Sequence, residues 1–217
     1  MTAHWSCATG VSRSSLIDGS RIVTAEVFAL TTSVDTHAVR AILATPAGKA
    51  AVNAPEADGT TPLDWAVRGE DLETTKQLIA AGANVNAANR YGVKPLSLAC
   101  ETANAAVVER LLEAGADANV VAGGDTALMT AARSGNVAVI RALLDYGADV
   151  NAHESWRGQT ALMWAATENN AGAVKALVEG GADLGQRSHG GFSALLFAVR
   201  AGRIEVARAL LESGANV

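Results

Sequence analysis

Apolar residues recur at helical spacing in short blocks along most of the chain, and the blocks repeat with a fixed period. In one block, the apolar positions between 128 and 132 predict a short amphipathic helix, and those between 139 and 144 predict a second one. A polar break at 134–136 separates them, and Gly147 stands where a helix end favours a left-handed residue. Each block is therefore expected to be a helix–turn–helix unit followed by a polar turn.

The block occurs five times between Asp58 and the C-terminus. The first glycines of the copies are 33, 32, 34 and 33 residues apart. These glycines are Gly59, Gly92, Gly124, Gly158 and Gly191. Because neither helix of a copy can bury its apolar stripe alone, the copies are expected to stack side by side into a solenoid. Such an architecture offers a binding surface rather than a reaction centre.

The boundaries of the first helix in each copy carry further signals. A hydroxyl residue that can cap the helix precedes it in four copies, at Thr61, Thr126, Thr160 and Ser193. Pro62 then takes the first helical position, where a missing N–H costs least. An alanine at one shared position lets these helices approach closely, namely at Ala66, Ala99, Ala131, Ala165 and Ala198.

These motifs resemble the ankyrin repeat. The similar segments are Thr61-Pro62-Leu63, the alanine pair of the first helix, a Leu-Leu followed by Gly-Ala, and Asp149-Val150-Asn151. The run 161–166 is similar to bacterial members of the family. The histidine that usually follows Thr-Pro-Leu is replaced by Asp64, Ser97, Met129, Met163 and Leu196. The resemblance implies an all-α, ankyrin-like solenoid of stacked helix–turn–helix units with projecting hairpin turns. It also implies non-catalytic protein–protein interaction.

The chain divides into three expected parts. Residues 1–23 carry no periodicity and are expected to be a tail without recognisable structure. Residues 24–57 fit the template weakly, with three extra residues near 46–48, and are expected to form a degenerate N-terminal capping repeat. Residues 58–217 hold the five repeats, the last one truncated. The sequence favours a fragment of a longer array; the other reading is an exposed apolar flank through which an otherwise monomeric protein could self-associate.

Composition narrows the classes of partner. The net charge is −5 and the acidity lies in the repeats, which argues against nucleic acid or an anionic membrane as the general partner. No apolar run approaches the roughly 18 residues of a membrane span. Without a recognisable signal peptide or disulfide framework, a cytoplasmic location is expected. A different N-terminus would reopen a periplasmic or secreted one.

No residue is predicted to be catalytic or to bind a metal or cofactor. The four histidines lack partners at metal-ligand spacing, and the Gly-Gly pairs lack the phosphate-loop motifs. The periodic aspartates Asp117, Asp149 and Asp183 are typical of turns. Cys100 stands where other copies have small apolar residues, which indicates a buried thiol. An enzyme is therefore not expected.

One position of the first helix forms a ladder of charges along the stack. It reads Arg68, Glu101, Arg133, Thr167 and Arg200, with Glu168 at the neighbouring position of the fourth copy. One interpretation is a surface whose charges compensate one another from repeat to repeat. The other is a mildly basic groove on an acidic protein, extended by Arg90, Arg157 and Arg187 in the turns.

Aromatic residues give a second indication of a contact surface. Trp164 occupies an inner-helix position where packing between repeats is the competing interpretation, whereas Tyr91, Trp156 and His189 stand at turn tips. The predicted partner-binding residues are Arg68, Arg90, Tyr91, Glu101, Arg133, Trp156, Arg157, Trp164, Glu168, His189 and Arg200. The predicted function is binding of another protein through the concave groove and turn tips. The alternative is a regulatory or targeting arm of a larger enzyme or effector whose catalytic part lies beyond the C-terminus.

Overall fold

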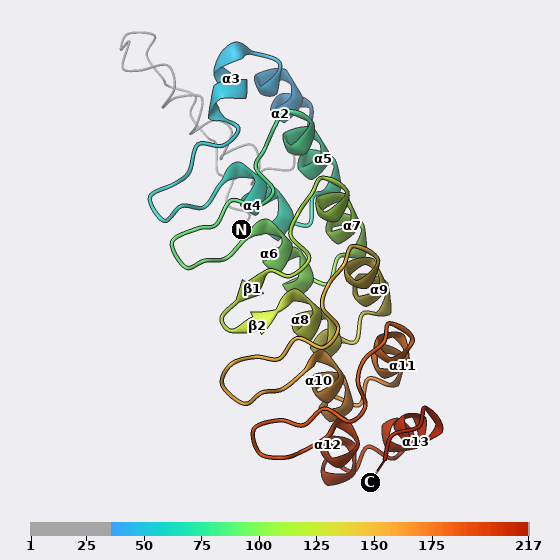
Figure 1. Cartoon of the computed structure of the whole chain (residues 1–217). Coiled ribbons are helices and arrows are strands. Elements are labelled where there is room, and N and C mark those ends of the chain that lie inside the picture. The colour runs from blue at the N-terminus through green and yellow to red at the C-terminus, as the bar shows by residue number, and fades with distance from the viewer. Residues whose placement is uncertain (1–35, 217) are drawn as a thin grey trace, which may run out of the picture.

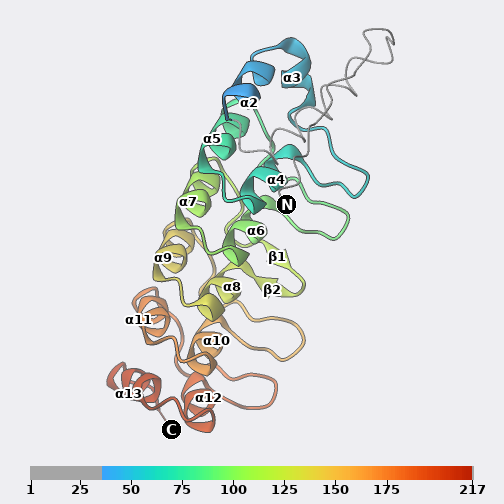
Figure 2. The same ribbon diagram turned by 180° about the vertical axis from the view of Figure 1, so that it is seen from behind.

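The computed structural model describes residues 36–216, and within them two rows of helices run along a stack (Figure 1). The inner row holds α4 (Pro62–Arg68), α6 (Pro95–Glu101), α8 (Ala127–Ser134), α10 (Ala161–Thr167) and α12 (Ala194–Arg200). The outer row holds α5 (Leu72–Ala80), α7 (Ala105–Glu113), α9 (Val137–Asp145), α11 (Ala171–Glu179) and α13 (Ile204–Glu212). Figure 2 shows that all the long turns project from the side of the inner row. The predicted solenoid of helix pairs is confirmed.

The inner helices begin at the predicted caps. The hydroxyl of Thr126 accepts a hydrogen bond from the N–H of Met129 at 3.2 Å, and Thr61, Thr160 and Ser193 act in the same way. The second repeat differs, because Lys94 at that position makes no side-chain cap. The outer helices α5, α7 and α9 are capped by Asp71, Asn104 and Asn136. Local chemistry therefore fixes where most of these short helices start.

The core is a continuous layer between the two rows. The five shared alanines of the inner helices are buried, which is what close contact between neighbouring repeats requires. A matching row of fully buried leucines comes from the outer helices and consists of Leu78, Leu111, Leu143, Leu177 and Leu210. Each repeat thus buries its apolar stripe against its neighbours, as expected for a solenoid.

The N-terminal end departs from the repeat pattern. Helix α2 (Thr36–Leu43) packs against α5, in line with the outer row. The extra residues predicted near 46–48 start another helix, α3 (Pro46–Ala51), which Thr45 caps by accepting from the N–H of Gly48 at 3.0 Å. The predicted tail 1–23 and the first part of the predicted capping repeat, 24–35, lie outside the described residues. The assignment of 24–57 as a capping repeat therefore stays a prediction.

An asparagine ladder ties each turn to the next repeat. The Nδ2 of Asn119 donates to the carbonyl of Gly147 at 3.1 Å, while its Oδ1 accepts from the N–H of Asp149 at 2.8 Å. The same pair of bonds is made by Asn53, Asn86 and Asn151. In the last repeat Gly185 takes the ladder position, so the register is held there without these two bonds. The ladder keeps successive turns at a constant spacing.

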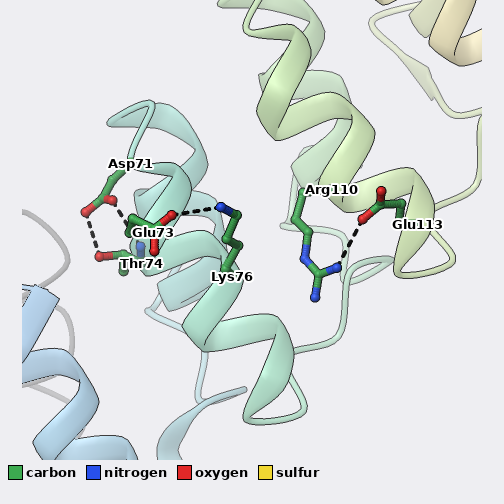
Figure 3. Close-up of polar contacts among 6 residues, drawn as sticks. All are labelled: Asp71, Glu73, Thr74, Lys76, Arg110 and Glu113. Atoms are coloured by element: carbon green, nitrogen blue, oxygen red, sulfur yellow. Dashed lines mark hydrogen bonds and ion pairs between the residues drawn. The ribbon is translucent and has the colours of Figure 1, made fainter.

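The outer surface balances its charges locally. Figure 3 shows Lys76 paired with Glu73 at 2.8 Å on α5, and Arg110 paired with Glu113 at 3.1 Å on α7. Both pairs join residues three apart on one helix and are exposed, so each contributes little stability. These two cations are therefore already committed to neighbouring carboxylates.

The C-terminal face of the last repeat is apolar and exposed. Ile204 is 71% exposed, and with Val199 and Leu211 it lines a shallow cavity of about 390 Å³. The position equivalent to Val199 in the fourth repeat, Ala166, is fully buried by the next repeat. This face is the apolar flank considered from the sequence; a longer array and self-association through this face both stay predictions.

Candidate functional site

The turn before the fourth repeat is built around a buried carboxylate. Glu154 is 7% exposed, and its two oxygens accept from the N–H groups of Trp156 at 2.5 Å, Arg157 at 2.7 Å and Gln159 at 3.1 Å. Its own N–H donates to the carbonyl of Gln159 at 3.0 Å. Burial opposes ionisation of Glu154, but these backbone hydrogen bonds and the nearby His189 hold its pKa below the usual range. One side chain therefore fixes the whole turn.

The tip of this turn presents an aromatic ring and a cation together. Trp156 is 79% exposed, and the guanidinium carbon of Arg157 lies 4.7 Å from the centre of its ring. A guanidinium at this distance over an indole is a favourable cation–π arrangement. Because the backbone beneath them is held by Glu154, both side chains start from a fixed position.

The fifth turn is locked to the fourth by His189. Its N–H donates to the carbonyl of Arg157 at 2.8 Å, and its Nδ1 lies 3.1 Å from the carbonyl of Trp156. The imidazole also lies against Gly158, where an added Cβ would come within 2.6 Å of the ring. Only glycine therefore allows this packing, and Gly158 also needs its positive φ of 66°.

Two further arginines of the inner helices lie over aromatic rings. Arg133 is 5.1 Å from the ring centre of Trp164 in the next repeat, and it forms an ion pair of 3.1 Å with Asp125. Arg200 is 5.4 Å from the ring centre of Phe192 in the fifth turn. These contacts cross from helix to helix or from helix to turn, so they depend on how the repeats stack.

Two adjoining cavities open on this surface. The first, of about 370 Å³, lies between the third and fourth turns and includes Arg133 and Trp164 in its lining. The second, of about 300 Å³, lies between the fourth and fifth turns and includes His189 and Arg200. Trp156, Arg157 and Gln159 line both cavities and form the wall between them. We refer to these two cavities together as the arginine–aromatic groove.

The third turn helps to open the first cavity. It is a short hairpin of β1 (Val121–Ala122) and β2 (Asp125–Thr126), with Gly123 and Gly124 at its tip. Within residues 36–216 these two-residue strands and an isolated β-bridge between His153 and Thr160 are the departures from the expected all-α structure. A tip of two glycines adds no side chain to the space between the turns, which leaves room beside Trp156.

Six of the eleven predicted partner-binding residues lie in the groove: Arg133, Trp156, Arg157, Trp164, His189 and Arg200. The other five line neither cavity. Arg68 lies over Trp65 at 5.6 Å, and the guanidinium of Arg90 donates to the carbonyl of Ala57. Tyr91 is 73% exposed at the second turn tip, and Glu101 and Glu168 are exposed on or beside inner helices.

The interpretation of the charge ladder as a chain of compensating pairs is not what the structure shows. No ion pair joins Arg68, Glu101 and Arg133 in the described part of the chain. Arg133 pairs instead with Asp125, which belongs to the third turn of its own repeat. Stacking on aromatic rings, rather than pairing along the ladder, organises these arginines.

Three residues of the site were missed from the sequence: Glu154, Asp125 and Phe192. For Glu154 a signal existed, because the fourth turn is one residue longer than the others. In the second turn, Asn89 accepts from the N–H groups of Tyr91 and Val93 at 2.9 and 3.0 Å. In the longer fourth turn Glu154 takes the equivalent position and accepts from the N–H groups of Trp156, Arg157 and Gln159. Asp125 and Phe192 gave no comparable signal.

Other chemistry has little support in the described residues. Within residues 36–216, no cluster of three or more His, Cys, Asp or Glu side chains is placed to hold a metal ion. Burial, with a smaller effect of Glu101, raises the pKa of the Cys100 thiol to about 12, so this thiol is unreactive at neutral pH. No helix of the described chain is long and apolar enough to cross a membrane.

Comparisons with known proteins agree with this architecture. The family model for ankyrin repeats (3 copies) matches residues 65–154 and 151–217. No curated protein matches the chain in sequence. Among solved structures, the chain is similar to EF0377, an ankyrin repeat protein, with 28% identity and a TM-score of 0.78, over 87% of this chain and 98% of that one. The expected resemblance is confirmed, and the chain belongs to the ankyrin-repeat family.

Proposed function

We propose that this protein binds another protein, without catalysis, through the arginine–aromatic groove and the turn tips beside it. The observation that carries the proposal is the fourth turn tip. Trp156 is 79% exposed, and exposure of so large an apolar ring to water is unfavourable. The ring stands on a turn whose backbone the buried Glu154 fixes. A rigid, exposed aromatic next to an arginine is the composition typical of binding hot spots.

The shape of the surface supports the same proposal. The two cavities lie on either side of Trp156 and Arg157, so a partner segment crossing the fourth turn would contact both of them. The turn backbone is already ordered, and little conformational entropy would be lost on binding. The outer helices differ in character: Lys76 and Arg110 there pair with carboxylates of their own helix, and the cavity of about 430 Å³ beside α5 has no aromatic side chain in its lining.

The test compares two double variants as baits for partners from the source organism. Trp156→Ala/Arg157→Ala removes the two side chains at the tip but leaves the backbone hydrogen bonds to Glu154 and His189. The matched control, Arg141→Ala/Tyr146→Ala, removes an arginine from the middle of α9 and an exposed aromatic from its C-terminal end. Both variants should keep the melting midpoint of the parent, since exposed substitutions change stability by about 0.5 kcal/mol or less.

The proposal predicts a protein retained by the parent and the control but lost from the Trp156/Arg157 variant. If the two variants retain the same proteins to the same extent, the groove is not the binding surface and the proposal fails.

A further inference from the structure

We propose that the second cavity of the arginine–aromatic groove captures carboxylates, so that the partner segment is an acidic peptide read by Arg157 and Arg200. This inference rests on the proposed function and names the chemistry of the partner. It follows from the state of the two guanidinium groups, from the charge of the cavity between them and from the charge of the rest of the protein.

The guanidinium groups of Arg157 and Arg200 are held over aromatic rings but have no anionic partner in the described chain. Each lies over an aromatic ring, at 4.7 Å from the centre of Trp156 and 5.4 Å from the centre of Phe192. Neither group makes a hydrogen bond or an ion pair with any residue of the described chain. Stacking uses the face of a guanidinium and leaves its N–H edge available, and that edge is the part that binds a carboxylate in a bidentate manner.

Arg133 provides an internal contrast. It also stacks on a ring, that of Trp164, but its guanidinium forms an ion pair with Asp125 at 3.1 Å. The groove therefore already contains one arginine–aromatic pair whose guanidinium has a carboxylate as its ion-pair partner. The same arrangement at Arg157 and Arg200 is complete except for the carboxylate.

The cavity between these two arginines contains no compensating charge. It is about 300 Å³ in volume, and its lining includes Arg157, Arg200, His189 and Ser188 but no aspartate or glutamate. The nearest carboxylate of the turn, Glu154, is committed to three backbone N–H groups. This volume lies at the lower limit of small-molecule pockets, which span about 300–1,000 Å³, and leaves room for acidic side chains of a peptide.

The negative charge of the rest of the protein favours binding of an acidic segment at this cavity over binding elsewhere on the surface. The protein carries −5, and carboxylates such as Glu109, Glu179 and Glu205 lie on the outer helices. An acidic segment would be repelled by most of the surface and attracted to the cavity, which favours one site and one orientation. Single-stranded nucleic acid is the competing anionic partner, but one face of each ring is occupied by a guanidinium, which leaves fewer ring faces to stack on bases.

The experiment selects peptides from a phage-displayed random library on the immobilised parent protein. The proposal predicts that the selected peptides are enriched in Asp and Glu at two or more positions. The strongest peptide, measured by fluorescence anisotropy, should lose at least about tenfold in affinity for Arg157→Gln/Arg200→Gln, a factor that corresponds to one well-made charged contact. Arg141→Gln, on the outer helix α9, is the matched control and should bind as the parent does.

Two further measurements separate a charged contact from a general loss of shape. Exchanging the acidic residues of the peptide for Asn and Gln should reproduce the loss seen with the arginine variant, and raising the salt concentration should weaken parent binding only. Arg157→Lys/Arg200→Lys should bind between the parent and the glutamine variant, because lysine keeps the charge but not the planar fork. Melting midpoints of all variants should match that of the parent.

The inference is overturned if the library yields no peptide whose affinity depends on Arg157 and Arg200. It is equally overturned if oligothymidylate binds the cavity more tightly than the best acidic peptide. Selected peptides that lack acidic residues but still require Trp156 would refute the carboxylate inference and leave the proposed function standing. Peptides that bind both Trp156/Arg157 and arginine variants like the parent would refute both.

Discussion

Replacing Glu154 by alanine removes the acceptor that holds the fourth turn and should destabilise it, while the arginine and aromatic side chains of the groove are kept. The carboxylate accepts from three backbone N–H groups, at distances between 2.5 and 3.1 Å. A hydrogen bond to a charged group contributes about 1.5–3 kcal/mol. Two of the donors, those of Trp156 and Arg157, belong to exposed residues and can turn to water, while the N–H of Gln159 stays buried.

We therefore expect a net loss of about 2 kcal/mol for Glu154→Ala, less than three full bonds, because water replaces part of the lost interaction. For a chain of this length that corresponds to a melting midpoint lowered by about 4–8 °C. The assay is thermal unfolding followed by circular dichroism at neutral pH. The control is Glu109→Ala, an exposed glutamate of α7, which should change the midpoint little.

The dependence on pH gives the same prediction an independent readout. The pKa of Glu154 is lowered in the folded protein, so its stabilising effect is present above the unfolded pKa of about 4.3 and is lost as the pH falls through the folded value. The difference in stability between parent and Glu154→Ala should thus shrink in acid. A variant that melts with the parent at neutral pH, or a difference that grows in acid, would refute the role assigned to this carboxylate.

Two further substitutions test the packing and the asparagine ladder. Leu143→Ala should lower the free energy of unfolding, measured by urea denaturation, by about 2–5 kcal/mol, because the side chain is fully buried. Leu211→Ala, at an exposed position, is the control and should lower it much less. Equal effects of the two substitutions would contradict the assigned core. Gly185→Asn should add the two missing ladder bonds, to the carbonyl of Gly214 and from the N–H of Asn216, and stabilise the last repeat by about 1 kcal/mol. The measurement is amide hydrogen exchange in α13. Exchange that is no slower in the variant than in the parent would count against the ladder.

The repeat period made much of the fold predictable. The period identifies equivalent residues in each repeat without any knowledge of tertiary structure. Spacing and local chemistry therefore predicted the caps at Thr61 and Thr126, the left-handed conformation of Gly147 and the buried alanines. The N-terminal end was less predictable, because α3 arises from a local insertion that the period does not describe.

The candidate site was predictable in its residues but not in its contacts. Exposed turn tips and the outward position of each inner helix identified Trp156, Arg157 and Arg200. The partners of these side chains depend on how neighbouring turns stack, and sequence spacing alone does not determine that. The contact of Arg200 with Phe192 in the preceding turn therefore emerged only from the structure.

The most direct test of a partner-binding groove is site-specific photo-crosslinking. The photoreactive residue p-benzoylphenylalanine would be placed at Ser155, in the wall of the first cavity, or at Lys175, exposed on α11. Each protein would be irradiated in extract of the source organism and examined for adducts of higher mass. The groove predicts a discrete protein adduct from Ser155 and none from Lys175. An adduct from Lys175 with none from Ser155 would place binding on the outer helices and contradict the account.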